Sequence, residues 1–337
     1  MRVCLCRRGA AKIVELLRGE LPRDEILECS PEEVTRVAQQ VEVLVPLIAR
    51  VGEEALASPR LRLVQQFGAG LDGVEVEVAS RHGIYVANVP SGDTANADSV
   101  AELAILLMIA LARRWPRAQE NLRARRVGAP VGTTLMGKTV AIVGFGGIGR
   151  VLARRLRGFG VRIVAVSRRG PRGEEGEVDL HVAVSALEEI LRQADFVVVA
   201  TPLNEETRGM IGRRAFASMK RGAFLINVAR GPVVEREALV AALESGQLAG
   251  AGLDVFWEEP PDPADPIFGL EVVATPHIGG ATDISLQEIA RGVARNVSRL
   301  RRGEVPRNCV NTSSVDAVAL AAKRNRRPMA RNGSGTE

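Results

Sequence analysis

Two side chains at the ends of apolar runs could do chemistry. Arg230 follows a strand-like run and precedes Gly231, a position where a charge is costly unless a partner stabilises it. Its guanidinium group could hold a carboxylate with two parallel hydrogen bonds and still reach a neighbouring oxygen. His277 follows Pro276 and precedes two glycines, which predicts an accessible loop. Because histidine gains and loses a proton near neutral pH, His277 is the natural candidate for a general acid and base.

The other titratable residues are less distinctive. His82 lies in a polar turn and His181 in a short strand, and we interpret both as structural or surface residues. Glu258 and Glu259 lie together in a proline-rich loop. They are either surface charges, or one of them favours the charged form of a nearby histidine. No pair of the four cysteines has the spacing of metal ligands, so no metal site is expected.

A glycine-rich turn between a predicted strand and a predicted helix indicates a dinucleotide site. The strand covers residues 139–143 and the helix residues 150–159. The first glycine of the turn permits a sharp bend, the second lets a pyrophosphate approach, and the last lets the helix pack against the strand. The free N–H groups of the helix N-terminus would face the phosphates. The expected phosphate contacts are the residues of the turn: Gly144, Gly146, Gly147, Ile148 and Gly149.

The end of the next predicted strand, residues 162–166, indicates which dinucleotide binds. An NAD site normally has an acidic residue here, which accepts hydrogen bonds from the ribose hydroxyls. This chain has Ser167, Arg168 and Arg169, and its next acid is Glu174. Arginine suits a 2′-phosphate, so NADP(H) is favoured and NAD(H) remains possible. The alternative is that both arginines are solvated surface residues.

The composition restricts the class of protein. The 337 residues suffice for two domains, and 46% of them are apolar but only 3% aromatic, which is typical of buried parallel strands packed against helices. The net charge is +5, and residues 312–337 contribute +3 of it, with five basic and two acidic residues. We therefore expect a solvated basic tail and no nucleic-acid partner. The longest apolar run, residues 103–112, is too short to cross a bilayer, so no membrane association is expected. Reduced cysteines and the lack of a secretory signal predict a cytoplasmic location.

Strand-like and helix-like segments alternate along the chain. The alternation predicts an α/β fold of parallel sheets with helices on both faces. Predicted strands lie at residues 2–6, 41–46, 61–67, 84–88, 139–143, 162–166, 196–200, 223–227, 250–255 and 271–274. Predicted helices include residues 10–18, 31–39, 53–57, 97–114, 150–159 and 284–302. Asn96 or Asp98 could cap the long helix that begins near residue 97.

Together these motifs resemble the D-isomer-specific 2-hydroxyacid dehydrogenases. The resemblance extends over residues 61–311. Besides the glycine turn it rests on FGAGLD at 67–72, VANVP at 86–90, SVAE at 99–102, NVARG at 227–231, GLDVF at 252–256, Glu259-Pro260 and TPHIGG at 275–280. It implies two doubly wound parallel-sheet domains, with a Rossmann cofactor domain inserted into a flavodoxin-like substrate domain. We expect a substrate domain at residues 1–96 plus 283–311, an NAD(P)-binding domain at 97–282 and a disordered basic tail at 312–337.

The resemblance also implies roles for the candidate residues. Arg230 would hold the carboxylate of a small 2-keto acid and polarise its carbonyl, and His277 would supply the proton. The acid of this family's motif directly precedes the proline, so Glu259 would orient His277. The backbone N–H groups of Ala69 and Gly70 would be a second grip on the carboxylate.

Further cofactor contacts follow from the same resemblance. Asp254 would accept a hydrogen bond from the nicotinamide carboxamide, although it could also be a turn-capping residue. Family members often carry histidine before the proline of the 201–202 pair, where this chain has Ala200-Thr201. The remaining expected contacts are Thr201, Pro202, Val228, Ala229, His277 and Gly279.

The leading hypothesis is a homodimeric reductase of glyoxylate or hydroxypyruvate. NAD-dependent oxidation of 3-phosphoglycerate or phosphite is the alternative, and a dinucleotide-sensing corepressor is a distant one. Phosphoglycerate-oxidising relatives often carry a basic residue where this chain has the neutral run 65–67, and formate-oxidising relatives carry Gln in place of Glu259. We expect dimer contacts from the helix at 97–114 and the arginine-rich arm at 115–132, which is long for an unsupported loop.

Overall fold

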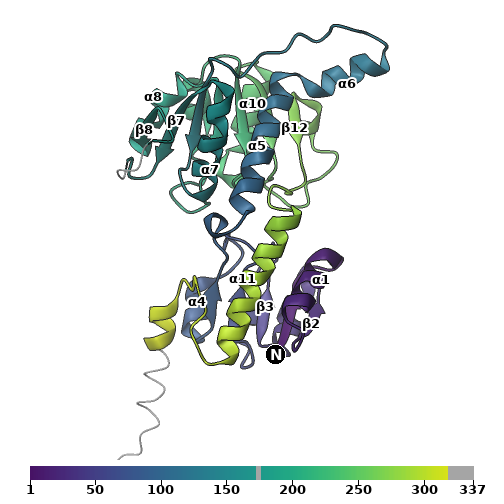
Figure 1. Cartoon of the computed structure of the whole chain (residues 1–337), viewed down its shortest axis with the longest axis vertical. Helices are drawn as coiled ribbons and strands as arrows, with labels where there is room; N and C mark the ends of the chain where they lie inside the picture. Colours follow the sequence, from purple (N-terminus) through teal and green to yellow (C-terminus); the bar gives the residue numbers. More distant parts are fainter. Residues whose placement is uncertain (172–175, 318–337) are drawn as a thin grey trace, which may run out of the picture. The chain divides into compact units, whose positions relative to one another are not determined.

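The computed structural model describes residues 1–171 and 176–317. The chain divides into two compact units (Figure 1). Unit 1 comprises Met1–Pro90 and the described chain from Gln287 onward, and unit 2 comprises Ser91–Leu286. From the sequence we expected the domain boundaries at residues 96 and 283, a few residues from those of the two units.

Unit 1 contains a parallel five-stranded sheet in the order β2-β1-β3-β4-β5. This is the flavodoxin-like order of a doubly wound sheet, as expected from the sequence. Its strands are β1 Arg2–Leu5, β2 Glu25–Glu28, β3 Val43–Val45, β4 Leu63–Gln65 and β5 Tyr85–Ala87. The helices in or entering this unit are α1 Ala11–Glu20, α2 Val34–Ala38, α3 Glu53–Leu56, α4 Val76–Arg81 and α11 Asp283–Arg301.

Unit 2 contains a parallel seven-stranded sheet in the order β12-β11-β10-β9-β6-β7-β8. Ranked along the chain and read from β8, the strands follow 3-2-1-4-5-6-7, which is the Rossmann order with one strand added. The strands are β6 Thr139–Val143, β7 Arg162–Ser167, β8 Leu180–Ala183, β9 Phe196–Val199, β10 Ala223–Asn227, β11 Leu248–Leu253 and β12 Val272–Ala274. The helices are α5 Asn96–Ala112, α6 Trp115–Arg123, α7 Gly147–Leu156, α8 Leu187–Leu191, α9 Arg213–Ser218 and α10 Arg236–Glu244. Short 3-10 turns of the two units are η1 Pro31–Glu33, η2 Ser91–Asp93, η3 Arg157–Phe159, η4 Val184–Ala186, η5 Gly231–Val233 and η6 Pro266–Gly269.

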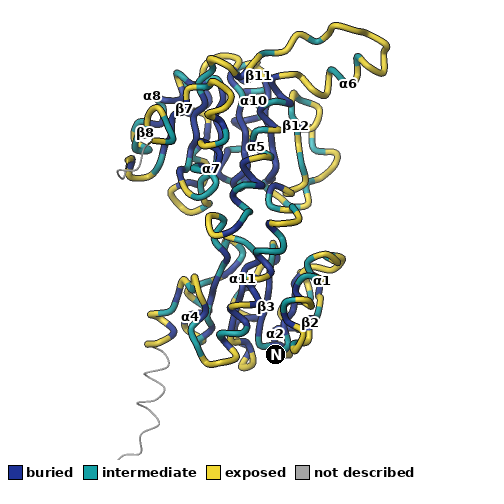
Figure 2. Tube along the Cα trace, viewed as in Figure 1, coloured by how far each residue is buried: buried dark blue, intermediate teal, exposed yellow. Residues whose placement is uncertain are grey.

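Helices cover both faces of the seven-stranded sheet because its strands are apolar on both sides. Successive side chains of a strand point to opposite faces. In β6, Val140 and Ile142 pack with α5 and α7, whereas Ala141 and Val143 pack with α8, α9 and α10. Figure 2 shows the strands of this sheet mostly in dark blue, as buried residues. A Cβ on Gly252 would lie 2.9 Å from the Cβ of Leu107, so α5 approaches the sheet closely at this glycine.

The structure differs from the sequence prediction at several elements. The sequence pattern did not predict the strand β2 or the helix α4, which are short and partly polar. It also did not predict the helices α8, α9 and α10. The short strand expected around His181 is β8. The expected loop of the arm begins with α6, and the N-cap of α5 is Ala95 rather than Asn96 or Asp98. Residues 312–317 are helical, with Val315 buried, so the expected disordered tail cannot begin at 312. The rest of that predicted tail, residues 318–337, lies outside the described residues.

Two further features bear on the class of protein. Cys4, Cys6 and Cys29 are buried in unit 1 as free thiols. Within residues 1–171 and 176–317, no helix combines the length and the apolar character needed to cross a bilayer.

Candidate active site

The glycine turn lies where the strand order of unit 2 reverses, between β6 and β9. Gly144 has φ +106°, and a Cβ here would lie 2.6 Å from the carbonyl of Ala200, so the turn after β6 touches the turn after β9. A Cβ on Gly149 would overlap the carbonyl oxygen of Gly144. Gly146, the N-cap of α7, has open space at its Cβ position. These are the features of a phosphate cradle in front of a helix N-terminus, so the residues fit a dinucleotide.

The end of β7 carries hydroxyl and guanidinium groups. The Ser167 hydroxyl lies 2.9 Å from Nε2 of His181, a residue that we interpreted from the sequence as structural or surface. Arg168 lies 3.8 Å from the Glu206 carboxylate, but both side chains are about two-thirds exposed, so the pair is weak. Arg169 is exposed. Glu174, the next acid in the sequence, lies outside the described residues.

Arg230 follows β10 in a loop that is held by Asn227. The side chain of Asn227 is buried, donates to the carbonyl of Arg230 at 2.9 Å and accepts from the N–H of Ala229 at 3.1 Å. A Cβ on Gly231 would overlap the carbonyl of Phe256. The loop after β10 therefore lies directly against the loop after β11. Arg230 itself is half-buried and donates from Nη1 to the carbonyl of Ala229 at 2.7 Å.

Glu259 and His277 form a hydrogen-bonded pair. Oε2 of Glu259 lies 2.6 Å from Nδ1 of His277, and Oε1 accepts from the N–H of Phe256 at 3.1 Å. Burial raises the pKa of Glu259. The hydrogen bond from His277, the charge of His277, the N–H of Phe256 and the charge of Arg230 outweigh that effect and hold the pKa below its usual value of 4.5. Glu259 is therefore an anion whose carboxylate lies in hydrogen-bond contact with the His277 ring.

The loop of His277 is fixed by Asp254, which is buried at the end of β11. Its Oδ1 accepts from the Thr275 hydroxyl at 2.7 Å and from the N–H of Ile278 at 2.8 Å. Its Oδ2 accepts from the N–H of Gly279 at 2.9 Å. Both carboxylate oxygens thus hold the ends of this loop, and His277 at its centre has φ +54°. A non-glycine residue rarely adopts this conformation, so the loop constrains its backbone.

The carboxyl ends of neighbouring parallel strands bring these residues together. Arg230, Glu259 and His277 follow β10, β11 and β12, which pair in that order. Thr201 and Pro202 follow β9, the next strand, and the Thr207 hydroxyl donates to the Pro202 carbonyl at 2.7 Å. Val228 and Ala229 lie between Asn227 and Arg230.

Ala69 and Gly70 belong to unit 1. They follow Gly68, which has φ +117°, and the carbonyl of Ala69 accepts from the Asn88 side chain at 2.7 Å. Within the part of the chain that the structure describes, the N–H groups of Ala69 and Gly70 donate no hydrogen bond. The loop therefore presents two backbone donors.

Sequence reasoning missed two groups that position the site. Asn227 is a polar residue at the end of the apolar strand β10, a pattern that could have marked it as a loop-holding residue. The Phe256 N–H, which holds Glu259, has no signal in the residue types. It acts through the backbone path of the loop after β11.

Comparisons with known proteins agree with this geometry. Residues 105–279 match the family model described as D-isomer specific 2-hydroxyacid dehydrogenase, NAD binding domain. A glyoxylate reductase of Thermococcus gammatolerans is 42% identical over 308 residues, 88% of each chain. D-3-phosphoglycerate dehydrogenase 2, chloroplastic, of Arabidopsis thaliana is 35% identical over 314 residues, 91% of this chain and 50% of that protein. The TT0316 protein of Thermus thermophilus has a similar crystal structure, with a TM-score of 0.80 and 32% identity over 92% of this chain and 100% of that one.

Proposed function

Because the chain belongs to the D-isomer-specific 2-hydroxyacid dehydrogenase family, we propose that it reduces glyoxylate or hydroxypyruvate to the corresponding 2-hydroxy acid, using NADPH. It is an oxidoreductase of the class that acts on CH–OH donors. The observation that carries the proposal is the 2.6 Å pair of Glu259 and His277, on the strand ends next to the loop of Arg230. Relatives that are glyoxylate reductases at about 40% identity support this choice of substrate.

The three side chains have separate tasks in this reaction. The guanidinium of Arg230 binds the substrate carboxylate and draws electron density from the adjacent carbonyl. The imidazolium of His277 donates from Nε2 to the carbonyl oxygen and gives up that proton as the alkoxide forms. Glu259 accepts from Nδ1, which fixes the ring orientation and stabilises the charged ring. The bound reduced nicotinamide would supply the hydride that reaches the carbonyl carbon.

We propose that the backbone N–H groups of residues 69 and 70 also bind the substrate carboxylate. Their free N–H groups are suited to a carboxylate because a backbone donor needs no side-chain ordering. For the cofactor, the proposed contacts are the turn Gly144–Gly149, the loop residues Thr201, Pro202, Val228 and Ala229, and Gly279. Asp254 already holds the loop of His277 with both oxygens, so its predicted contact with the nicotinamide remains a prediction.

We propose NADP(H) as the preferred cofactor and NAD(H) as a possible one. The support is the end of β7, where Ser167 replaces the usual acid and Arg168 and Arg169 are exposed and available to a 2′-phosphate. Changing both arginines to alanine should raise KM for NADPH about tenfold to a hundredfold and leave KM for NADH nearly unchanged. An equal effect on both cofactors would contradict the assignment.

Oxidation of 3-phosphoglycerate is the second candidate, favoured by the similarity to the Arabidopsis thaliana enzyme. The run that precedes the loop at 68–70 argues against it. Gln65 and Gln66 are neutral amides, so they offer no charge to a phosphate. Both are also buried and hydrogen-bonded inside unit 1. The decisive comparison is kcat/KM of the wild-type enzyme for glyoxylate, hydroxypyruvate, pyruvate and 3-phosphohydroxypyruvate, each with NADPH and NADH. A clear preference for the phosphorylated acid would overturn the proposal.

We also propose a homodimer formed through α5 and the arm at residues 115–132. Figure 2 shows most of this arm as exposed. Large apolar side chains are exposed on both elements: Leu106 56% on α5, and Trp115 55%, Leu122 70%, Val127 99% and Val131 83% on the arm. Such a set is typical of an interaction surface. Leu122→Glu should lower the mass measured by light scattering, whereas a monomeric wild-type enzyme would contradict the proposal. The expected cytoplasmic location remains a prediction.

A further inference from the structure

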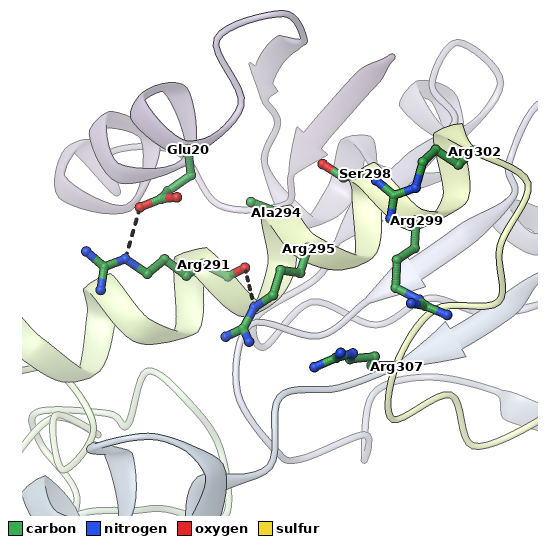
Figure 3. A pocket seen from close by; sticks show the side chains of 8 residues that line it. All are labelled: Glu20, Arg291, Ala294, Arg295, Ser298, Arg299, Arg302 and Arg307. Carbon is green, nitrogen blue, oxygen red and sulfur yellow. Dashed lines mark hydrogen bonds and ion pairs between the residues drawn. The ribbon is translucent and has the colours of Figure 1, made fainter.

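The outward face of α11 in unit 1 is strongly basic and hollowed. Its cavity of about 650 Å³ is lined by Glu20 of α1, by Ala294 and Ser298, and by five arginines: Arg291, Arg295, Arg299, Arg302 and Arg307 (Figure 3). Arg291, Arg295 and Arg299 come from successive turns of α11, Arg302 directly follows its last residue, and Arg307 lies in the loop beyond. None of these residues belongs to the proposed substrate or cofactor site.

The carboxylates near this hollow neutralise only part of it. Glu20 pairs with Arg291 at 3.2 Å. Glu304 pairs with Arg299 at 3.1 Å and with Arg302 at 2.6 Å, and these arginines lower its pKa, so it is ionised. Five guanidinium groups thus face two carboxylates, and an excess of three positive charges remains.

The excess charge is concentrated on two arginines. Arg295 donates to the backbone carbonyl of Arg291 at 3.3 Å, and among the described residues its guanidinium has no other hydrogen-bond or ion-pair partner. Within residues 1–171 and 176–317, the Arg307 guanidinium has no hydrogen-bond or ion-pair partner. Both are exposed, so their donors are available to a ligand.

Helix stability does not explain why these arginines lie together. Like charges four residues apart destabilise a helix, and Arg291, Arg295 and Arg299 have this spacing. Attraction to the helix dipole favours arginine only in the last turn, and Arg307 lies beyond the helix altogether. In contrast, Arg301 in that last turn is paired with the buried Asp24.

We propose that this hollow binds a small anion that carries several phosphate groups. Arginine forks bind phosphate oxygens with two hydrogen bonds each, and a cavity of this volume is in the range that small ligands occupy. A single nucleic-acid strand fits less well, because binding it usually requires aromatic side chains that stack on the bases, and no aromatic residue lines the hollow. The site is independent of the proposed reaction.

Calorimetric titration of the full chain with inorganic tripolyphosphate tests the proposal. Saturating NADPH is present throughout, so that the dinucleotide site, including the place proposed for the 2′-phosphate, is filled. We expect one tripolyphosphate per chain, bound less tightly at higher salt because the contacts are ionic. Changing Arg295 and Arg307 together to alanine should weaken binding about tenfold to a hundredfold. Changing Arg23 and Arg60, two exposed arginines of unit 1 outside the hollow, is the matched control and should leave the affinity unchanged.

Three outcomes would overturn the proposal. The first is that the wild-type chain shows no saturable binding in the presence of NADPH. The second is that both double variants lose affinity equally, which would indicate a general charge effect. The third is that a single-stranded oligonucleotide binds through Arg295 and Arg307 while tripolyphosphate does not. Thermal unfolding of both double variants checks that they fold, and their glyoxylate reduction should match that of the wild type.

Discussion

The substitution Glu259→Gln isolates the charge of the acid beside His277. Glutamine has the same shape, so the loop after β11 keeps its packing. Its amide, however, cannot accept from both groups that Glu259 now serves, the Phe256 N–H and Nδ1 of His277. Either the amide N–H₂ meets the Phe256 N–H, or it donates to the histidine and stabilises the neutral ring. In both cases the charged ring loses its partner.

The size of the effect follows from the geometry of the pair. Two unit charges about 4 Å apart attract by about 4 kcal/mol at an effective dielectric constant of about 20. The side chains are 34% and 21% exposed, so solvent reduces this figure. A loss of about 3 kcal/mol raises the barrier enough to lower kcat roughly 10²-fold, within the range usual for acid–base groups.

The assay is the steady-state oxidation of NADPH by glyoxylate across a range of pH. We expect kcat to fall about 10²-fold in Glu259→Gln, with little change in KM for NADPH. Glu258→Gln, an exposed neighbour, is the matched control and should behave as the wild type. The reasoning is refuted if Glu259→Gln keeps more than half of the wild-type kcat.

Three further predictions concern other parts of the chain. Gly149→Ala places a Cβ against the carbonyl of Gly144, so it should destabilise the fold by about 1–3 kcal/mol and lower Tm in calorimetry; an unchanged Tm would contradict the close approach. Asp254→Asn loses acceptors for the loop of His277 and should lower kcat at least about tenfold, as measured by turnover. Burial raises the pKa of Asp24, but Arg301 and the N-terminal ammonium lower it overall. Because that pKa is lowered in the folded state, the ionised group stabilises the fold above pH about 4 and this stability is lost as the pH falls through the folded-state pKa. Urea unfolding should therefore find Asp24→Asn less stable than the wild type at pH 7, with a smaller difference at pH 3.

Much of the fold could be predicted from the local sequence pattern, whereas several short elements could not. The strands β6 and β10 begin and end at the predicted residues, since their apolar runs are bounded by charged or glycine-rich turns. β2 has the sequence EILE on a sheet edge, where one buried side chain gives too little pattern. α6 has no buried residue, so no core-facing stripe marks it. The helices α8, α9 and α10 were also missed, although their apolar residues pack into the core of unit 2.

Some residues of the candidate site could be predicted from residue types, and others could not. Arg230 and His277 could be singled out because each is an isolated polar group at the end of an apolar run. The choice between Glu258 and Glu259 could not be made from residue types, and required the resemblance to a family. In the structure, Glu258 is exposed and Glu259 contacts His277. The path of the loop after β11 decides this, and tertiary packing sets that path.

We propose above that Arg230 and His277 catalyse the reduction of a 2-keto acid by NADPH. The most direct test is glyoxylate-dependent oxidation of NADPH by the wild type and by Arg230→Ala, His277→Ala and His82→Ala, with dinucleotide binding measured in parallel by fluorescence. The account predicts fast turnover that falls at least about 10²-fold in the first two variants and persists in His82→Ala, while all four proteins bind NADPH. Wild-type binding of NADPH without turnover of any 2-keto acid, or full activity in His277→Ala, would contradict it.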